Sequence, residues 1–153
     1  MQTTVARGTV KKFILLAAIV ATQSHASKWV EFVINSPDNP GAISEVDVES
    51  LKSKFGFLRA WVRTTSDTPS AVPGTLKKAK SLMYLAWMDC ALNKFAISEH
   101  YYFSDINFGG QVVSLTDLRF SQEAIAGAMS PITPDIMTLK LKELICSMAS
   151  QSE

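Results

Sequence analysis

The sequence predicts an α+β fold in which an antiparallel β-sheet carries a C-terminal α-helix packed on one face. Most segments after residue 28 are short and alternate apolar with polar residues, as half-buried strands do. Stretches rich in Gly, Pro, Asn and Asp separate these segments and indicate turns. The last apolar segment, in contrast, has the three-to-four-residue spacing of a helix. A sheet followed by a helix that covers it belongs to the α+β class.

Composition narrows the possible functions. A length of 153 residues, with 47% hydrophobic and 19% charged, predicts one globular domain. The net charge of +1 gives no general attraction for nucleic acid, so no such partner is expected. The chain has no EF-hand loop, GxSxG or HExxH motif, and its two His and two Cys are scattered. We therefore expect a non-enzymatic protein that needs no metal or other cofactor.

The first 26 residues have the three parts of a secretory signal peptide. Residues 1–12 hold three basic residues and no acidic one, residues 13–21 form an apolar run, and small residues stand at positions 24 and 26. Cleavage is expected between Ala26 and Ser27, which leaves residues 27–153 as a single domain, either periplasmic or secreted. The apolar run is shorter than the roughly 20 residues that span a bilayer. We therefore expect no stable membrane anchor after the signal is removed.

Cys90 and Cys146 are the two cysteines of the chain. An even number of cysteines in an exported protein predicts a disulfide bond. The chain has no CxxC motif for redox chemistry, and two Cys with the distant His100 make a poor zinc site. A nucleophilic Cys would need a nearby base, for which His100 is the sole candidate. The structural disulfide is the preferred interpretation.

Three strands are expected in the first half of the domain. Residues 29–34 and 45–50 alternate, and a long turn-rich connection at 35–41 would join them as a hairpin. Residues 55–64 form the third strand, and the composition of residues 64–74 indicates a loop. One face of the third strand carries Arg59, Trp61 and Arg63. Aromatic residues and Arg are enriched where interfaces concentrate binding energy, so these three residues are a hypothetical binding site.

The second half holds one ambiguous segment and two expected helices. Residues 76–92 fit either a buried strand or a buried helix, because periodicity cannot separate the two. Lys77, Lys78 and Lys80 open this segment, either as a solvated end or as a contact patch for an acidic partner. Residues 95–104 and 111–115 form a hairpin around 105–110, and residues 121–129 form a short helix.

The C-terminal helix has the clearest signals. Thr133 is the expected N-cap, with Pro134 at the first helical position and Asp135 in the first turn. An apolar stripe runs from Met137 to Met148. Cys146 lies on the opposite side of an ideal helical wheel, so either two sides of the helix are covered or the helix ends before it.

Two further sets of residues are candidate catalytic groups. His100 could act as an acid or base, but its neighbour Glu99 points to the other face of a strand and cannot orient it. A surface or core-edge role is preferred for His100. Asp47 and Glu49 alternate onto one strand face and could form a carboxylate pair. The preferred interpretation is that both lie on the solvated face of an edge strand.

A set of landmarks in fixed order resembles the surface-adhesin protein E-like family of Gram-negative bacteria. The landmarks are Asp47, Ser50, Trp61, Asp89-Cys90, Tyr101-Tyr102, Gly109 or Gly110 before Val113-Ser114, Pro131 and Ile145-Cys146. The resemblance covers residues 29–146. It implies an antiparallel sheet whose C-terminal helix is held by a bond between Cys90 and Cys146. It also implies a role in adhesion, with extracellular-matrix or plasma proteins such as vitronectin and laminin as the partner class.

One departure from the family concerns the anchor. The surface adhesin is a lipoprotein, whereas this chain has Ala26-Ser27 where the lipid-bearing Cys would stand. The alternative function is therefore a soluble periplasmic accessory or inhibitor protein of the cell envelope. A small hydrolase built on His100 is the third and least favoured hypothesis. Pairing of sheet edges offers a route to a protein partner or to a homodimer.

Overall fold

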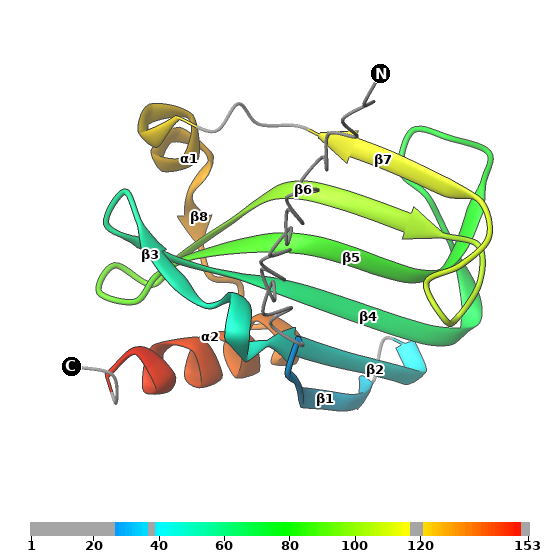
Figure 1. Cartoon of the computed structure of the whole chain (residues 1–153), viewed down its shortest axis with the longest axis horizontal. Helices are drawn as coiled ribbons and strands as arrows, with labels where there is room; N and C mark the ends of the chain where they lie inside the picture. The colour runs from blue at the N-terminus through cyan, green and yellow to red at the C-terminus, as the bar shows by residue number, and fades with distance from the viewer. Residues whose placement is uncertain (1–26, 37–38, 117–120, 151–153) are drawn as a thin grey trace, which may run out of the picture.

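The computed structural model describes residues 27–36, 39–116 and 121–150 and confirms the predicted α+β fold (Figure 1). The elements are β1 (Trp29–Ser36), β2 (Asn39–Asp47), the 3₁₀ turn η1 (Val48–Ser50), β3 (Lys52–Lys54), β4 (Phe57–Ala71), β5 (Lys78–Asp89), β6 (Lys94–Phe103), β7 (Val112–Thr116), α1 (Gln122–Ala128), β8 (Ser130–Pro131) and α2 (Ile136–Ala149). The expected leader, residues 1–26 ending in Ala26, lies outside the described residues, so its cleavage before Ser27 stays a prediction.

Within the described residues, eight strands form one antiparallel sheet. The main path runs β1-β2-β4-β5-β6-β7, so sequential hairpins build most of the sheet. The short strand β3 pairs with the first residues of β4, and β8 pairs with the start of β6. The predicted hairpins at residues 29–50 and 95–115 are confirmed.

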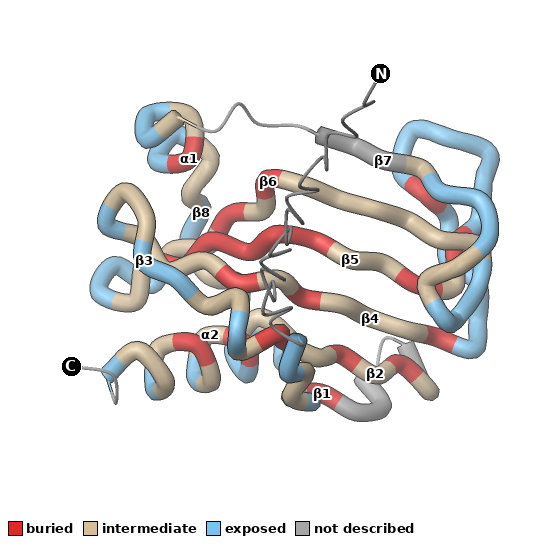
Figure 2. The backbone as a smooth tube through the Cα atoms, in the orientation of Figure 1, coloured by how far each residue is buried: buried red, intermediate tan, exposed pale blue. Residues whose placement is uncertain are grey.

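The two faces of the sheet are covered by different helices (Figures 1 and 2). Met88 of β5 packs with Ile145 of α2 in one core cluster. Trp87, its neighbour in the strand, points to the other face and packs with Ile125 of α1. Residues 84–88 are all 4% exposed or less. This burial on both sides explains the continuous apolar run and resolves the ambiguous segment as a strand.

Two expectations about the first hairpin are wrong. The connection is short, because β1 and β2 pair up to Ser36 and Asn39, and only residues 37–38 lie between them. The second strand ends at Asp47, where η1 begins, instead of running to residue 50. Register shifts in the pairing of β1 with β2 also interrupt the simple alternation expected at residues 29–34.

The loop expected at residues 64–74 is also wrong in its first part, because β4 continues to Ala71. Its end pairs with β5, with Ser70 opposite Ala79 and a register shift after Thr65. The backbone hydrogen bonds of this pairing outweigh the turn-forming composition of the segment. The remaining turn is tied by Val72, whose N–H donates to the Lys77 carbonyl at 3.0 Å.

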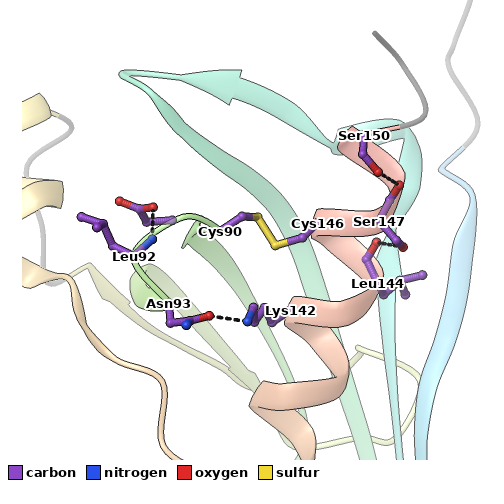
Figure 3. The surroundings of a disulfide bond; sticks show 9 residues. Cys90, Leu92, Asn93, Lys142, Leu144, Cys146, Ser147 and Ser150 are labelled. Carbon is purple, nitrogen blue, oxygen red and sulfur yellow. Dashed lines mark hydrogen bonds between the residues drawn. A yellow bond between two sulfur atoms is a disulfide. The ribbon is translucent and has the colours of Figure 1, made fainter.

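The C-terminal helix packs on the sheet through its predicted stripe. Leu141 and Ile145 are 0% and 1% exposed. The helix stays regular to Ala149, past Cys146, which forms the disulfide with Cys90 at the end of β5 (Figure 3). Lys142 also donates a hydrogen bond from this side of the helix to the turn after β5. Two sides of the helix are therefore covered, which decides between the alternatives left open by the sequence.

The N-cap of α2 differs from the expected one. Asp135, not Thr133, caps the helix, because its carboxylate accepts the Thr138 N–H at 2.8 Å. The Thr133 hydroxyl donates to the same carboxylate at 2.6 Å. Burial alone would raise the pKa of Asp135, but the hydrogen bonds from Thr133 and Thr138 outweigh it and lower that pKa.

Replacing this cap has a testable pH signature. We expect Asp135→Ala to lower the free energy of unfolding by about 1 kcal/mol at pH 7. Because the folded-state pKa is lowered, the stabilisation by the charged carboxylate is present above about pH 4 and is lost as the pH falls further. The gap between wild type and variant in urea unfolding should therefore shrink from pH 7 to pH 3. Asp135→Asn keeps an acceptor and is the control; an unchanged gap would contradict this account of the cap.

Candidate binding site

The sheet face opposite α2 is closed at one end by α1. Trp87 is fully buried there, and its indole N–H donates to the Ser98 hydroxyl at 2.8 Å. The Phe55 ring stacks on it with centroids 6.3 Å apart. Phe55 and Gly56 both have positive φ, as a two-residue turn between β3 and β4 requires. This end of the face is therefore filled by the packed cluster of Trp87, Phe55 and Ile125.

The turn between β6 and β7 reaches over the other end of the same face. The Ser81 hydroxyl of β5 donates to the Asp105 carbonyl at 2.6 Å. Phe108 meets Phe103 edge to face, with centroids 5.6 Å apart. Gly110 has φ of 76°, and a Cβ there would lie 2.1 Å from the Ser104 hydroxyl oxygen. The turn thus needs glycine at this position, which agrees with the hairpin signal in the sequence.

Arg63 is held beneath this turn. Its guanidinium donates two hydrogen bonds to Glu45, at 2.6 and 3.0 Å, from the opposite position in β2. It also lies over the rings of Trp29 and Phe108, 4.2 and 5.3 Å from their centroids. Both the charge and the flat faces of Arg63 are used within the fold. Of the three residues expected at a binding site, Arg63 therefore has a structural role.

Between the two covered ends lies a pocket of about 490 Å³. Its lining contains the other two expected residues, Arg59 and Trp61. The complete lining is Ser50, Lys52, Lys54, Arg59, Trp61, Leu85 and Glu99. Lys52 and Lys54 were not singled out in the sequence, because the segment Lys-Ser-Lys lacks the apolar alternation that marks a strand. Their spacing of two residues was the available signal, since it places both on one side of β3.

Hydrogen bonds organise the walls of the pocket. The Tyr101 hydroxyl donates to Glu99 at 2.8 Å, and the Tyr101 ring lies 6.0 Å from that of Trp61. The hydrogen bond to Glu99 raises the pKa of Tyr101, and burial and the Glu99 charge add to the increase. On the other side, the Ser50 hydroxyl accepts the Trp61 N–H at 2.9 Å. Two lining residues, Ser50 and Glu99, are thus held in place by hydrogen bonds within the fold.

The interpretation of Asp47 and Glu49 as a solvated pair on an edge strand is wrong. Asp47 is 6% exposed, and its carboxylate accepts the N–H groups of Lys28 and Glu49, each at 3.1 Å. It therefore caps η1 and ties down the start of β1. Glu49 is exposed beyond the end of β2, and β2 is an inner strand between β1 and β4.

His100 lies apart from the pocket. It pairs with Tyr84 in β5, and its ring lies 6.3 Å from Tyr84 and 6.1 Å from Tyr102. Glu99 pairs instead with Leu85, which faces the pocket side of the sheet, so Glu99 and His100 point to opposite faces as expected. Among residues 27–36, 39–116 and 121–150, no three His, Cys, Asp or Glu residues are grouped as metal ligands would be.

A comparison with family models matches residues 20–147 to the surface-adhesin protein E family. The chain belongs to the surface-adhesin protein E family. The match covers most of the chain, and the resemblance inferred from the sequence landmarks is confirmed. The family assignment makes the protein an adhesin-like module of a surface or exported type. A search of curated proteins finds no match.

Solved structures support the same assignment at the level of the fold. Protein E from non-typeable Haemophilus influenzae is similar with a TM-score of 0.51 and 14% identity, over 82% of this chain and 79% of that one. A second crystal form of Haemophilus influenzae protein E gives 0.50 and 13%, over 80% and 92%. In the part of the chain that the structure describes, no helix is long and apolar enough to cross a membrane.

Proposed function

We propose that this family member is an exported, non-enzymatic binding module that recognises a protein partner through the pocket between α1 and the β6–β7 turn. The observation that carries the proposal is the placement of Arg59 and Trp61 in one solvent-open pocket. Within small domains large aromatics are mostly buried, and a partly exposed Trp beside Arg is typical of an interface centre. Extracellular-matrix or plasma proteins are the proposed partner class, by analogy with the family's adhesive role.

The proposed route to this function begins with export. A signal peptide at residues 1–26, cut between Ala26 and Ser27, would deliver residues 27–153 as one domain to the periplasm or the exterior. The disulfide between Cys90 and Cys146 supports export, because such bonds persist in oxidising compartments. The outer strands β1 and β7 remain candidates for pairing two copies into a homodimer.

Binding of purified protein to a panel of matrix and plasma proteins tests the proposal. Residues 27–153 would be immobilised, and binding would be followed by biolayer interferometry. We expect saturable binding to at least one panel protein, weakened about tenfold or more by Trp61→Ala, as for a central interface aromatic. Leu76→Ala, which changes a fully exposed side chain in the β4–β5 turn, is the control and should bind as the wild type does.

Two outcomes would contradict the proposal. Absence of saturable binding across the panel would reject the partner class and direct attention to periplasmic partners. Binding that Trp61→Ala leaves unchanged, in a variant whose circular dichroism matches the wild type, would show that the partner uses another surface. Thermal melts of both variants keep a folding defect distinct from a binding defect.

A further inference from the structure

Three cationic side chains meet at the pocket. Lys52 and Lys54 come from β3, and Arg59 comes from β4. Lys52 stands directly opposite Arg59 in the register of the β3–β4 pair. Two like charges at directly opposed strand positions repel each other and destabilise the hairpin. The pairing of Lys52 with Arg59 is therefore unfavourable unless a negatively charged group lies near both side chains.

Within the described residues the fold offers these cations ring contacts and no ion pairs, and the Lys54 Nζ lies 4.8 Å from the centroid of the Phe55 ring. Glu99 is the only acidic residue of the lining, so one acidic group faces three cationic ones. Among the described residues Arg59 contacts the Trp87 ring at 5.7 Å and makes no ion pair. Lysines on short edge strands do protect a sheet from aggregation. That role does not account for Arg59, which lies on an inner strand between β3 and β5.

We propose that this pocket binds an acidic segment of the partner protein, with its carboxylates between Lys52, Lys54 and Arg59. The proposal rests on the proposed function and names the chemistry of the partner at that same site. Guanidinium and ammonium groups that converge on one pocket are suited to carboxylates, since charge-assisted hydrogen bonds are the stronger ones. The pocket volume of about 490 Å³ is in the range that holds a few side chains.

The remaining lining favours a polypeptide over a uniformly charged polymer. Trp61 and Leu85 give the pocket an apolar floor, which fits apolar or aromatic side chains between the carboxylates. Glu99 on the opposite wall would repel a chain with a negative charge on every unit, such as a sulfated glycan. A peptide that alternates acidic and apolar residues meets both requirements.

The lysines of the β4–β5 turn provide a matched comparison. Lys77 and Lys78 are exposed and lie outside the pocket lining. Together with Lys80 they form the alternative patch for an acidic partner that the sequence suggests. Since Lys77→Glu/Lys78→Glu changes the net charge as much as Lys52→Glu/Lys54→Glu does, the two double variants separate a local site from a general charge effect.

The test measures fluorescence anisotropy of a labelled short peptide that alternates glutamate and phenylalanine. We expect saturable binding to the wild type at low salt, weakening as salt increases. The pocket variant Lys52→Glu/Lys54→Glu should bind about tenfold more weakly, and the turn variant less than twofold more weakly. The pocket variant should fold as well as the wild type, because its new carboxylate at position 52 faces Arg59 and removes the repulsion.

Several results would overturn the inference. Equal weakening in both double variants would show a general charge effect, and equal binding of a glutamine-for-glutamate peptide would show that carboxylates are not recognised. Binding of heparin oligosaccharide at this pocket, with no binding of the peptide, would assign the cations to a glycan. If a panel protein binds the wild type and the pocket variant equally, the proposed function stands and the acidic-segment inference fails.

Discussion

Removal of the Cys90–Cys146 disulfide is expected to lower the free energy of unfolding by about 4 kcal/mol. The bond joins residues 56 positions apart, so it removes much freedom from the unfolded chain. It links the end of β5 to the last turns of α2, where the Lys142 side chain also bonds Asn93 (Figure 3). Since a small domain has a total stability of about 5–15 kcal/mol, this loss is a large share.

The double variant Cys90→Ala/Cys146→Ala makes the measurement without leaving a free thiol. Urea unfolding followed by circular dichroism should show a lower midpoint and a somewhat steeper dependence on urea, because the uncrosslinked unfolded chain exposes more surface. Leu141 and Ile145 should keep α2 docked in the folded state. Wild-type protein under reducing conditions is the control and should match the variant. An unchanged midpoint after verified reduction would rule out the expected stabilisation.

Trp87→Ala is expected to cost about 3–5 kcal/mol of stability, as large aromatic truncations in cores do. The ring is fully buried between the sheet and α1, stacks on Phe55 and donates its N–H to Ser98. Its removal would leave a cavity and take away the partner of a buried hydroxyl. The same change would loosen the wall against which Arg59 rests.

Two further variants divide this cost into parts. Trp87→Phe keeps an aromatic ring but not the N–H, so it should fall between wild type and alanine. Leu92→Ala, 64% exposed in the turn after β5, should change the unfolding free energy by less than about 0.5 kcal/mol. Chemical unfolding curves at 25 °C measure all three. A Trp87→Ala variant as stable as Leu92→Ala would mean that this cluster is not part of the core.

Several strand and helix predictions needed no tertiary information. Alternation in residues 55–64 places Ala60 and Val62 on the strand face opposite the hypothetical binding residues, and both are fully buried. The stripe containing Leu141 and Ile145 likewise placed the buried side of the C-terminal helix. These signals depend only on neighbours along the chain, which is why they could be read from it.

The candidate site was predicted only in part. Arg59, Trp61 and Arg63 share one strand face in the sequence, and nothing local distinguishes the two arginines. The register with β2 places Glu45 opposite Arg63, so that arginine is paired within the fold. The register with β3 places Lys52 opposite Arg59, and the pocket follows from that juxtaposition.

The sequence by itself determined the α+β class, the cysteine pair and the family. Alternation, residue counts and the order of landmarks can all be read along the chain, without knowing which residues are in contact. The tertiary structure alone decided that residues 78–89 are a strand and that β4 continues through a turn-like segment to Ala71. It also decided that Arg63 is paired with Glu45, whereas Arg59 lies in the pocket with Lys52 and Lys54. The physical reason is that strand pairing joins residues far apart in the chain, and its hydrogen bonds and burial outweigh local preference.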